Sequence, residues 1–502
     1  MEYVLGVDVG TGGTRAVLVD RSGAIVSSAT AEHVPFASPQ TGWAEQDPQD
    51  WHKAAGLAIR QAITDAGVSP ESIKCAGLAG QMHGAVLLDE KDEVLRRSLI
   101  WCDQRTQPQC DWLNSKLGET KIIELTCNPA LTNFTLTKLL WVRDNEPEIW
   151  KRFRRVLLPK DYVRFRLTGE HAIDVADASG TLMLDVTQRK WSEEMMSAAG
   201  LPMSCLPKVY ESPEVCGRIT AEGAAHSGLK EGTPVVAGAG DQAGGAVGMG
   251  IVRAGAVSAT IGTSGVVFAA TDSPAMDKKG RVHTFRHAVP GRWHVMGVTQ
   301  AAGLSFRWLR DLLRGSGQLS YDDLTREAGA ISPGSDGVLW APYLMGERTP
   351  HLDPYARATL TGLAASHTRA HVTRAVLEGV AFSLKDTFSL FEEMRVPVTN
   401  IRLGGGGARS ELWRQIQADI YAHEVEILAA EEGAAYGGGL LAGVGARFWG
   451  SVDEACDAVV KVQHGIKPQP KAVNALGQQY ENYRRLYPAL KPVFQTSATA
   501  TS

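Results

Sequence analysis

The chain has 502 residues, of which 44% are hydrophobic and 21% charged, a balance that is ordinary for a globular protein. This length exceeds what one hydrophobic core supports, so we expect roughly two to four domains. The formal net charge of −4 argues against a nucleic acid or an anionic membrane as the main partner. No apolar run is long enough to cross a bilayer, and the first residues enter a strand without the basic segment of a signal peptide.

Seven cysteines are scattered along the chain. None of them forms a C-x-x-C pair, and their number is odd, so the sequence indicates neither a disulfide framework nor a zinc site. We therefore expect reduced thiols and a cytoplasmic location.

The first predicted element is a hairpin. An apolar strand runs from Tyr3 to Asp8, a turn follows at Gly10–Gly13, and a second strand spans Thr14–Asp20. Glycine N–H groups in such a turn can approach an anion closely, and Thr11 adds a hydroxyl. Asp8, at the strand end, is placed to hold Mg²⁺ beside that anion. The alternative is an ordinary edge hairpin with a solvated aspartate, because glycine-rich turns are common.

Further strands and a helix follow the hairpin. A third strand is predicted over Ile25–Thr30 and a helix over Pro48–Ala66, with Asp47 as its N-cap and Pro48 as its first residue. Another strand is expected over Ile73–Ala79. Strands and a covering helix in this order predict a mixed sheet in an α/β fold.

Four candidate site residues come soon after that last strand. Met82 and His83 lie at its end, although a lone histidine is more often structural than functional. Asp103 and Arg105 follow within one short segment, and a surface ion pair is the alternative to a binding role. The stretch from Leu99 to Leu206 is predicted to be rich in helices.

The hairpin recurs in the second half of the chain. Strands are predicted over Ala256–Ile261 and Val266–Ala270, with the turn Gly262–Gly265 between them. This is the arrangement seen around Gly10–Gly13, and an internal repeat of this kind predicts two related domains that face each other. Chance recurrence of a short glycine turn is the alternative.

Asp241 follows a predicted strand over Thr233–Ala239 and is surrounded by small residues. A carboxylate in such an open setting can accept the proton of an attacking alcohol. Helix capping is the alternative role for this residue. Arg348 and His351 are weaker candidates for a site.

A third glycine-rich turn, Gly404–Gly407, links a short strand to a helix that ends near Ile420, and such a turn suits an anion or a nucleotide. Neither a P-loop nor a G-x-G-x-x-G with a suitably spaced acid is present. After Leu490 the chain is polar, and we expect a disordered tail. Three other helices are predicted, one beginning near Ala301 and two over Ala370–Met394 and Ala434–Val444.

An ordered series of motifs resembles the FGGY carbohydrate kinases, and among them most closely the xylulokinases. The resemblance runs from Tyr3 to Tyr487 and is more specific than any single motif. Its motifs are, in chain order, DVGTGGT, GWAEQDP, GQMHGA, KLLWV, LLPKDY, GTSGV, GERTPH, RAVLEGV and GGGARS.

The resemblance implies an α/β fold of two actin-like (ribonuclease H-like) domains with a nucleotide cleft between them. It places the sugar side in residues 1–250, the nucleotide side in residues 251–490 and a polar tail in residues 491–502. It implies ATP-dependent phosphorylation of D-xylulose at its terminal hydroxyl, with Mg²⁺. The expected partners are a small sugar and ATP, with neither nucleic acid nor membrane, and a homodimer is left open.

The resemblance also implies roles for single residues. Asp241 is then the general base, Asp8 the metal-side acid, and Met82 and His83 lie at the sugar. Asn often follows the catalytic Asp in xylulokinases, whereas this chain has Gln242, and the extra methylene leaves the sugar preference open. Further sugar-side candidates are Asp103 and Arg105, and the positions expected at the nucleotide and its phosphates are Thr11, Gly12, Gly13, Thr263, Gly303, Arg307, Gly406 and Ser410.

Three other functions stay open. A kinase for ribulose, gluconate, fuculose or glycerol would share every phosphate-binding feature. An actin- or Hsp70-like ATP-driven binding protein would also carry two hairpins, but it would not need a histidine that faces a sugar. A sugar-binding regulator without catalysis would not need both Asp8 and Asp241. ADP release that depends on sugar separates the kinases from the others.

Overall fold

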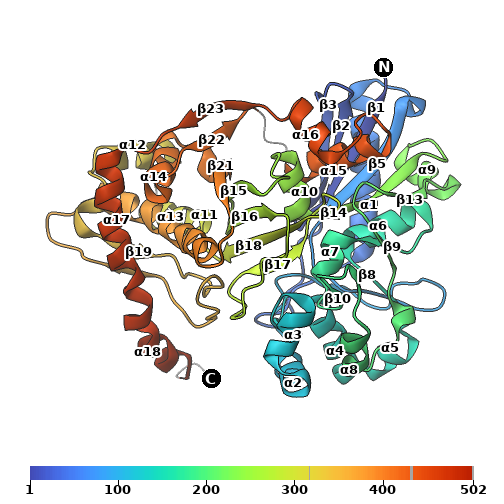
Figure 1. The fold of residues 1–502 in the computed structure, drawn as a ribbon, viewed down its shortest axis with the longest axis horizontal. Coiled ribbons are helices and arrows are strands. Elements are labelled where there is room, and N and C mark those ends of the chain that lie inside the picture. Colours follow the sequence, from blue (N-terminus) through green and yellow to red (C-terminus); the bar gives the residue numbers. More distant parts are fainter. Residues whose placement is uncertain (316, 430–432, 500–502) are drawn as a thin grey trace.

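Two mixed β-sheets, each flanked by helices, lie side by side in the computed structural model (Figure 1). The structure describes residues 1–315, 317–429 and 433–499. Within these residues no helix is both long and apolar enough to cross a membrane. All seven cysteines are free thiols, as the sequence predicts.

The first sheet has the strand order β13-β14-β5-β1-β2-β3. Strands β1, β2 and β3 form an antiparallel meander, whereas β1, β5 and β14 run parallel to one another. The C-terminal ends of those three parallel strands therefore meet at one edge of the sheet. The strands are β1 (Tyr3–Val9), β2 (Gly13–Asp20), β3 (Ile25–Glu32), β5 (Ile73–Gly80), β13 (Val215–Arg218) and β14 (Pro234–Gly240).

The second sheet has the order β17-β18-β16-β15-β21-β22-β23 and repeats this plan. Strands β15, β16 and β18 are antiparallel neighbours, and β15, β21 and β22 are parallel. The predicted internal repeat is thus confirmed, because both hairpins open an equivalent sheet. The strands are β15 (Gly255–Ile261), β16 (Gly265–Thr271), β17 (His283–Arg286), β18 (Trp293–Thr299), β21 (Val398–Gly405), β22 (Val425–Leu428) and β23 (Val462–Ile466).

Helix α1 spans Pro48–Ala66, as its local signals predict. The Asp47 side chain accepts a hydrogen bond from the backbone N–H of Gln49, and Gly67 closes the helix in the left-handed conformation. Its apolar face packs on β2 and β3. The other helices of the first half are α2 (Gln107–Leu117), α3 (Glu119–Thr126), α4 (Thr135–Asn145), α5 (Pro147–Arg152), α6 (Pro159–Thr168), α7 (Val175–Ser179), α8 (Glu193–Ala199), α9 (Ala221–Ser227) and α10 (Asp241–Gly248).

In the second half, α13 is a long helix with most of its residues buried. Small two-stranded sheets complete the fold, among them β4 (Glu45–Gln46) with β7 (Ser98–Leu99), β6 (Val86–Leu88) with β8 (Arg155–Leu157), β9 (Ala172–Asp174) with β12 (Lys208–Tyr210), β10 (Leu184–Asp185) with β11 (Lys190–Trp191) and β19 (Leu339–Ala341) with β20 (Thr359–Thr361). The helices of this half are α11 (Gly303–Leu313), α12 (Tyr321–Gly329), α13 (Arg369–Glu393), α14 (Glu411–Tyr421), α15 (Gly433–Gly445), α16 (Val452–Val459), α17 (Pro470–Arg484) and α18 (Leu486–Thr499).

Helices α15 and α16 belong to the second half of the sequence but lie beside the first sheet (Figure 1). Helix α15 packs against β1, β5 and α10, and its small residues allow that close approach. A Cβ at Gly437 or at Gly6 would collide with the backbone of the facing segment. A division of the chain at residue 250 therefore does not separate the two sheets with their helices completely, because α15 and α16 follow residue 250 but lie beside the first sheet.

The expectation of a disordered tail after Leu490 is wrong for the residues that the structure describes. Helix α18 continues to Thr499, and residues 500–502 lie outside the described residues. Phe494 is buried in the core of the second half. Burial of this one apolar side chain holds the helix against the core, although the rest of the stretch is polar.

Candidate active site

Three parallel strands of the first sheet bring the candidate residues to one edge. Asp8 lies near the end of β1, Met82 and His83 follow β5, and Asp241 is the first residue of α10, directly after β14. Residues at the carboxyl ends of neighbouring parallel strands lie close together, and ligands bind there in open α/β sheets. The fold therefore assembles residues that are more than 230 positions apart in sequence.

Burial, and to a smaller extent the negative charge of Asp8, raises the pKa of the Asp241 carboxyl to about 7. Hydrogen bonds from the backbone and the side chain of Gln242 act in the opposite direction. Gly240 occupies the N-cap position of α10 and no side chain caps this helix, so the capping alternative for Asp241 is wrong. A carboxyl group with a pKa near neutrality is suited to accept and return a proton.

Asp8 faces Arg15 across the β1–β2 ladder. Burial raises the pKa of its carboxyl to about 6, although the charge of Arg15 lowers it. The Oδ1 atom of Asp8 is buried and has no hydrogen-bond partner among the described residues. An oxygen of this kind can serve as a ligand for a hard divalent cation.

His83 has a fixed tautomer. Its Nδ1 donates to the carbonyl oxygen of Gly180 at 2.6 Å, so Nε2 is left as an acceptor. Burial lowers the pKa of this imidazole to about 3, which keeps it neutral at physiological pH. The edge of its ring meets Phe134, with 5.2 Å between ring centroids. Met82 lies beside it, and a Cβ placed on Gly240 would come within 2.7 Å of the Met82 Cγ.

Side chains from other segments hold the first hairpin turn. The Gln46 amide donates to the Thr11 carbonyl oxygen at 2.8 Å, and the Trp101 indole donates to the Thr11 hydroxyl at 2.9 Å. Gly12 is exposed, and a Cβ there would meet no atom within 4 Å. The turn is thus fixed from behind, while its tip stays open to a ligand.

The second hairpin turn borders a cavity of about 450 Å³. Ala302 and Leu304 donate their backbone N–H groups to the Thr263 carbonyl oxygen, which ties the turn to the start of α11. Gly303 donates to the Gly262 carbonyl oxygen, and a Cβ at Gly303 would collide with that oxygen. All five residues of the second half that the sequence assigns to the nucleotide line this cavity, namely Thr263, Gly303, Arg307, Gly406 and Ser410.

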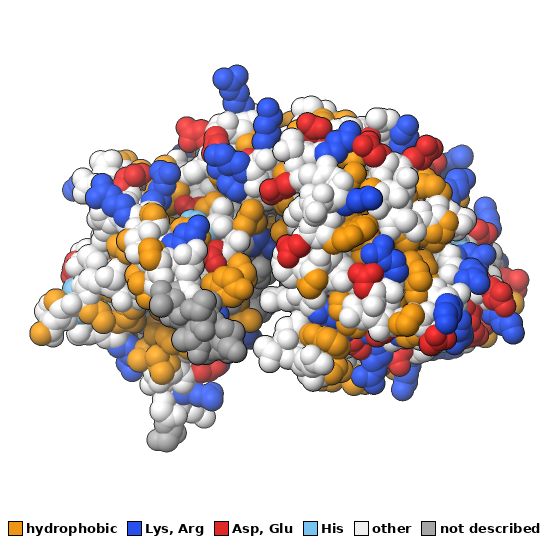
Figure 2. Space-filling model, turned by 90° about the horizontal axis from the view of Figure 1, so that it is seen from below, with side chains coloured by type: hydrophobic (Ala, Val, Ile, Leu, Met, Phe, Trp, Pro, Cys, Tyr) orange, Lys and Arg blue, Asp and Glu red, His pale blue; other side chains and the backbone are white. Residues whose placement is uncertain are grey.

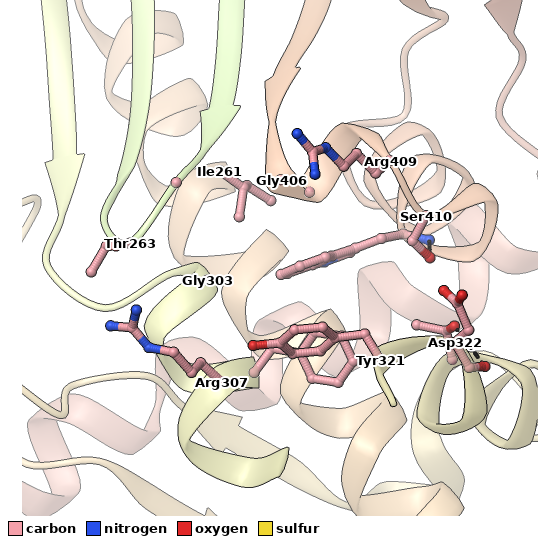
Figure 3. A pocket seen from close by; sticks show the side chains of 14 residues that line it. Ile261, Thr263, Gly303, Arg307, Tyr321, Asp322, Gly406, Arg409 and Ser410 are labelled. Atoms are coloured by element: carbon pink, nitrogen blue, oxygen red, sulfur yellow. Dashed lines mark hydrogen bonds between the residues drawn. The ribbon is translucent and has the colours of Figure 1, made fainter. Parts of the chain in front are cut away.

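Figure 3 shows how this cavity is arranged. Thr263 and Arg307 lie at one end, Asp322 and Ser410 at the other, and the Tyr321 ring lies between them. Trp413 also lines the cavity and donates its indole N–H to the Leu377 carbonyl oxygen at 3.0 Å. Sequence reasoning missed the aromatic residues, because they lie outside the glycine-rich turns that gave the signal.

Asp103 and Arg105 form an ion pair, but not at the surface as the alternative reading supposed. Both are buried, and the Arg105 Nη2 atom lies 2.7 Å from the Asp103 Oδ2 atom. That oxygen also accepts the backbone N–H of Ala44, and Trp43 covers the guanidinium at 3.6 Å. The pair thus fixes the segment that precedes α1, and a direct sugar contact for either residue stays a prediction.

A buried charge cluster lies beneath the strand edge, and sequence reasoning missed it although Lys160 and Asp161 belong to the LLPKDY motif. The Lys160 ammonium is within 3.0 Å of carboxylate oxygens of Asp161, Asp174 and Asp177, all of them fully buried. A Cβ on Gly240 would lie 3.3 Å from the Asp177 Oδ1. Lys160 therefore occupies the middle of a carboxylate set that would otherwise suit a metal ion.

The two weaker candidates, Arg348 and His351, lie in different surroundings. His351 stacks on Tyr487, with 3.6 Å between ring centroids, and its Nε2 lies 3.2 Å from the Tyr343 hydroxyl. Arg348 has no ion-pair partner among the described residues, and its charge contributes to lowering the pKa of His83 in the other half. The structure thus places Arg348 near the sugar-side residues, whereas His351 packs within the second half.

Two family models match the chain. The N-terminal domain of the FGGY family of carbohydrate kinases matches residues 3–248, and its C-terminal domain matches residues 257–446. The fold and the site together thus define a two-domain α/β carbohydrate kinase. The chain belongs to the FGGY family, whose members are ATP-using phosphotransferases that generally need a divalent metal.

Individual relatives agree over nearly the full length. The chain is 37% identical to a xylulose kinase of Bacillus subtilis, with 97% of each chain covered. It is 38% identical to a xylulose kinase of Escherichia coli, over 97% of this chain and 99% of the relative. The crystal structure of a xyloylose kinase from Brucella ovis has 36% identity and a TM-score of 0.91, and the match covers 98% of this chain and all of that one.

Proposed function

We propose that this protein transfers the γ-phosphoryl group of ATP to the terminal C5 hydroxyl of D-xylulose. Relatives named xylulose kinase, similar over nearly the whole chain, support the sugar and the reaction. The observation that carries the proposal is Asp241, a carboxyl at the carboxyl end of β14 whose pKa is raised to about 7 by burial and by the nearby charge of Asp8. A reaction that removes a proton from an alcohol needs a base of this kind.

The phosphoryl transfer is an in-line displacement at the γ-phosphorus of ATP. The sugar O–H bond breaks as its proton moves to an Asp241 carboxylate oxygen, and a new bond forms between the sugar oxygen and the γ-phosphorus. The bond between the γ-phosphorus and the β,γ-bridging oxygen breaks at the same time, and its electrons leave with ADP. Asp241 returns its proton to water before the next cycle.

ATP and Mg²⁺ fit the residues that the structure brings together. The cavity of about 450 Å³ lies within the range of small-molecule pockets. Its residues come from three glycine-bearing segments of the second half and from the start of α12. We assign the phosphates to the backbone at Gly12, Gly13 and Thr263, and the metal to the unpartnered oxygen of Asp8. Bound Mg²⁺ supplies charge neutralisation at the transferring phosphoryl group.

On the sugar side we assign His83 Nε2 as the acceptor of a hydrogen bond from a sugar hydroxyl and Met82 as an apolar contact. Gln242, held against Asp241 by a hydrogen bond, limits the space at the reacting end. Asp103 and Arg105 act at the sugar through the position of the segment that they fix. In this scheme residues 1–250 carry most of the sugar contacts and residues 251–490 most of the nucleotide contacts.

ADP formation across a panel of ketoses, aldoses and polyols tests the proposal. We expect D-xylulose to give the highest kcat/KM and ADP release to be negligible without sugar. ADP release without any sugar would refute a kinase and favour an ATP-driven binding protein. A higher kcat/KM for ribulose, gluconate, fuculose or glycerol would refute the assignment of the sugar but not of the phosphoryl transfer.

A further inference from the structure

A second cavity, of about 590 Å³, lies in the second half of the chain. Its walls come from α13, from α17 and the start of α18, from the segment of residues 343–351 and from Arg281. Helix α17 runs beside α13 (Figure 1). None of the residues assigned above to the sugar or the nucleotide lines this cavity, so the proposed reaction leaves it without a role.

Tyrosine rings form much of the wall. The Tyr480 hydroxyl donates to the Asp386 Oδ1 at 2.7 Å, and the hydroxyls of Tyr343 and Tyr483 lie 3.2 Å apart. Tyr487 lines the cavity too, with the His351 ring stacked on it. These contacts fix the rings, so that the wall offers flat apolar faces and hydroxyl groups in set positions.

Asp386 is the polar centre of the cavity. The side chain of Asp386 is buried, with 7% of the residue exposed. Burial raises the pKa of its carboxyl to about 7, although the Tyr480 hydrogen bond and the charge of Arg484 lower it. The Tyr480 hydroxyl satisfies Oδ1, whereas Oδ2 accepts no hydrogen bond from the described residues and is not among their fully enclosed polar atoms, so a ligand can reach it. A buried acceptor with a free oxygen, facing a cavity large enough for a small molecule, indicates a ligand that donates hydrogen bonds.

The charges around the cavity exclude two classes of ligand. Arg281 donates to the carboxylates of Asp277 and Glu393, so its guanidinium is not available to an anion. Arg484 lies beside the carboxyl of Asp386. Glu392 also lines the cavity, but its side chain is exposed and water screens its charge. Around Asp386 itself, one carboxyl faces one guanidinium, so a phosphate or a polyamine gains little here. Aromatic faces with a carboxylate acceptor instead suit a neutral molecule that carries several hydroxyl groups.

Helix α13 connects this cavity with the nucleotide cavity. Its Leu377 carbonyl oxygen holds the indole of Trp413, which lines the nucleotide cavity, and its Asp386 and Ser389 line the second cavity. Nine residues separate Leu377 from Asp386, which is about 13 Å along a helix. Between them, the Ser383 hydroxyl donates to the Thr299 hydroxyl at 2.8 Å, next to the segment that leads to α11.

We propose that this cavity is a second small-molecule site, which takes a neutral polyhydroxylated ligand of the sugar or polyol class and is coupled to the nucleotide cavity through α13. Helix α13 contacts both cavities, through Leu377 and Trp413 at one and through Asp386 and Ser389 at the other. A ligand that shifts the helix at one cavity therefore shifts its contacts at the other. Coupling of this kind is reciprocal: the polyol changes the affinity for ADP by the same factor by which ADP changes the affinity for the polyol.

Xylitol is a suitable probe, titrated into the full-length protein by calorimetry with inorganic phosphate as a comparison. Ser389→Trp fills the cavity with an indole, whereas Ser389→Ala removes only a hydroxyl and is the matched control. We expect Ser389→Trp to bind one equivalent of xylitol fewer than the wild type and Ser389→Ala to lose none. The readout is this difference, so it does not depend on whether xylitol also binds in the cleft.

A second variant, Asp386→Asn, tests the proposal even where Ser389→Trp fails to fold. Asp386→Asn keeps the shape of the cavity, and we expect it to weaken the same binding event about tenfold or more, as loss of a charged acceptor does. We also expect xylitol to shift the ADP Kd at least twofold in the wild type but not in Ser389→Trp. Equal xylitol stoichiometry in wild type and Ser389→Trp, or saturable binding of phosphate lost in Ser389→Trp, would overturn the proposal.

Discussion

Burial of Asp241 raises its pKa, which suits the carboxyl to act as a base but makes its ionised form costly to the stability of the fold. Replacement by Asn tests these two consequences separately. The amide has nearly the same shape as the carboxylate but cannot accept the sugar proton. General-base catalysis contributes about 10²–10⁴-fold to rate, so we expect kcat to fall by about that factor or more. Sugar and ATP binding should change much less, because the cavity walls and His83 are unaffected.

The same substitution should stabilise the protein, most strongly at neutral to alkaline pH. A carboxyl whose pKa is 3.8 when unfolded and about 7 when folded holds its proton more tightly in the folded state. Ionising it therefore destabilises the fold as pH rises from about 4 to 7, and the full penalty is present above pH 7. A shift of that size corresponds to about 4 kcal/mol, and we halve it to about 2 kcal/mol because Asp241 is partly exposed.

Thermal or urea unfolding of wild type and Asp241→Asn at pH 5 and pH 8, without ligands, measures the effect. We expect Asn to raise the free energy of unfolding by about 2 kcal/mol at pH 8 and by clearly less at pH 5. Equal differences at the two pH values would refute the argument from burial. Near-normal turnover of the variant would refute the role of Asp241 as the base.

Three further predictions follow from the same site. Asp8→Asn removes the like charge that helps to raise the pKa of Asp241, so the midpoint of the pH–rate profile should move to lower pH; a midpoint that stays in place would count against this coupling. His83→Ala should raise the KM for the sugar with little change in the KM for ATP, and an unchanged sugar KM would contradict its placement. Gly303→Ala forces a methyl group against the Gly262 carbonyl oxygen and should destabilise the protein by about 1–3 kcal/mol, whereas Gly12→Ala, with open space around it, should not; equal unfolding midpoints for the two variants would disprove the packing argument.

Much of the secondary structure is written locally in the sequence. Asp47 and Pro48 begin α1 at the predicted residue, and Ala66 followed by Gly67 ends it, because capping depends on residues within one turn. The recurrence of a glycine turn between two apolar strands predicted the duplicated sheet. Glycine-rich turns also marked Thr263 and Gly406 as phosphate or nucleotide candidates, and the family resemblance added Gly303. The structure brings all three to one cavity.

Other properties needed the tertiary structure. The sequence does not show that α15 returns to the first sheet, that Phe494 anchors α18, or that Asp103 and Arg105 are buried together. Each depends on contacts between segments far apart in the chain, which no local pattern encodes. The roles of the carboxylates depend on them too. The sequence shows only that Asp8 and Asp241 are acids, whereas burial raises the pKa of Asp8 to about 6, and burial together with the charge of Asp8 raises the pKa of Asp241 to about 7.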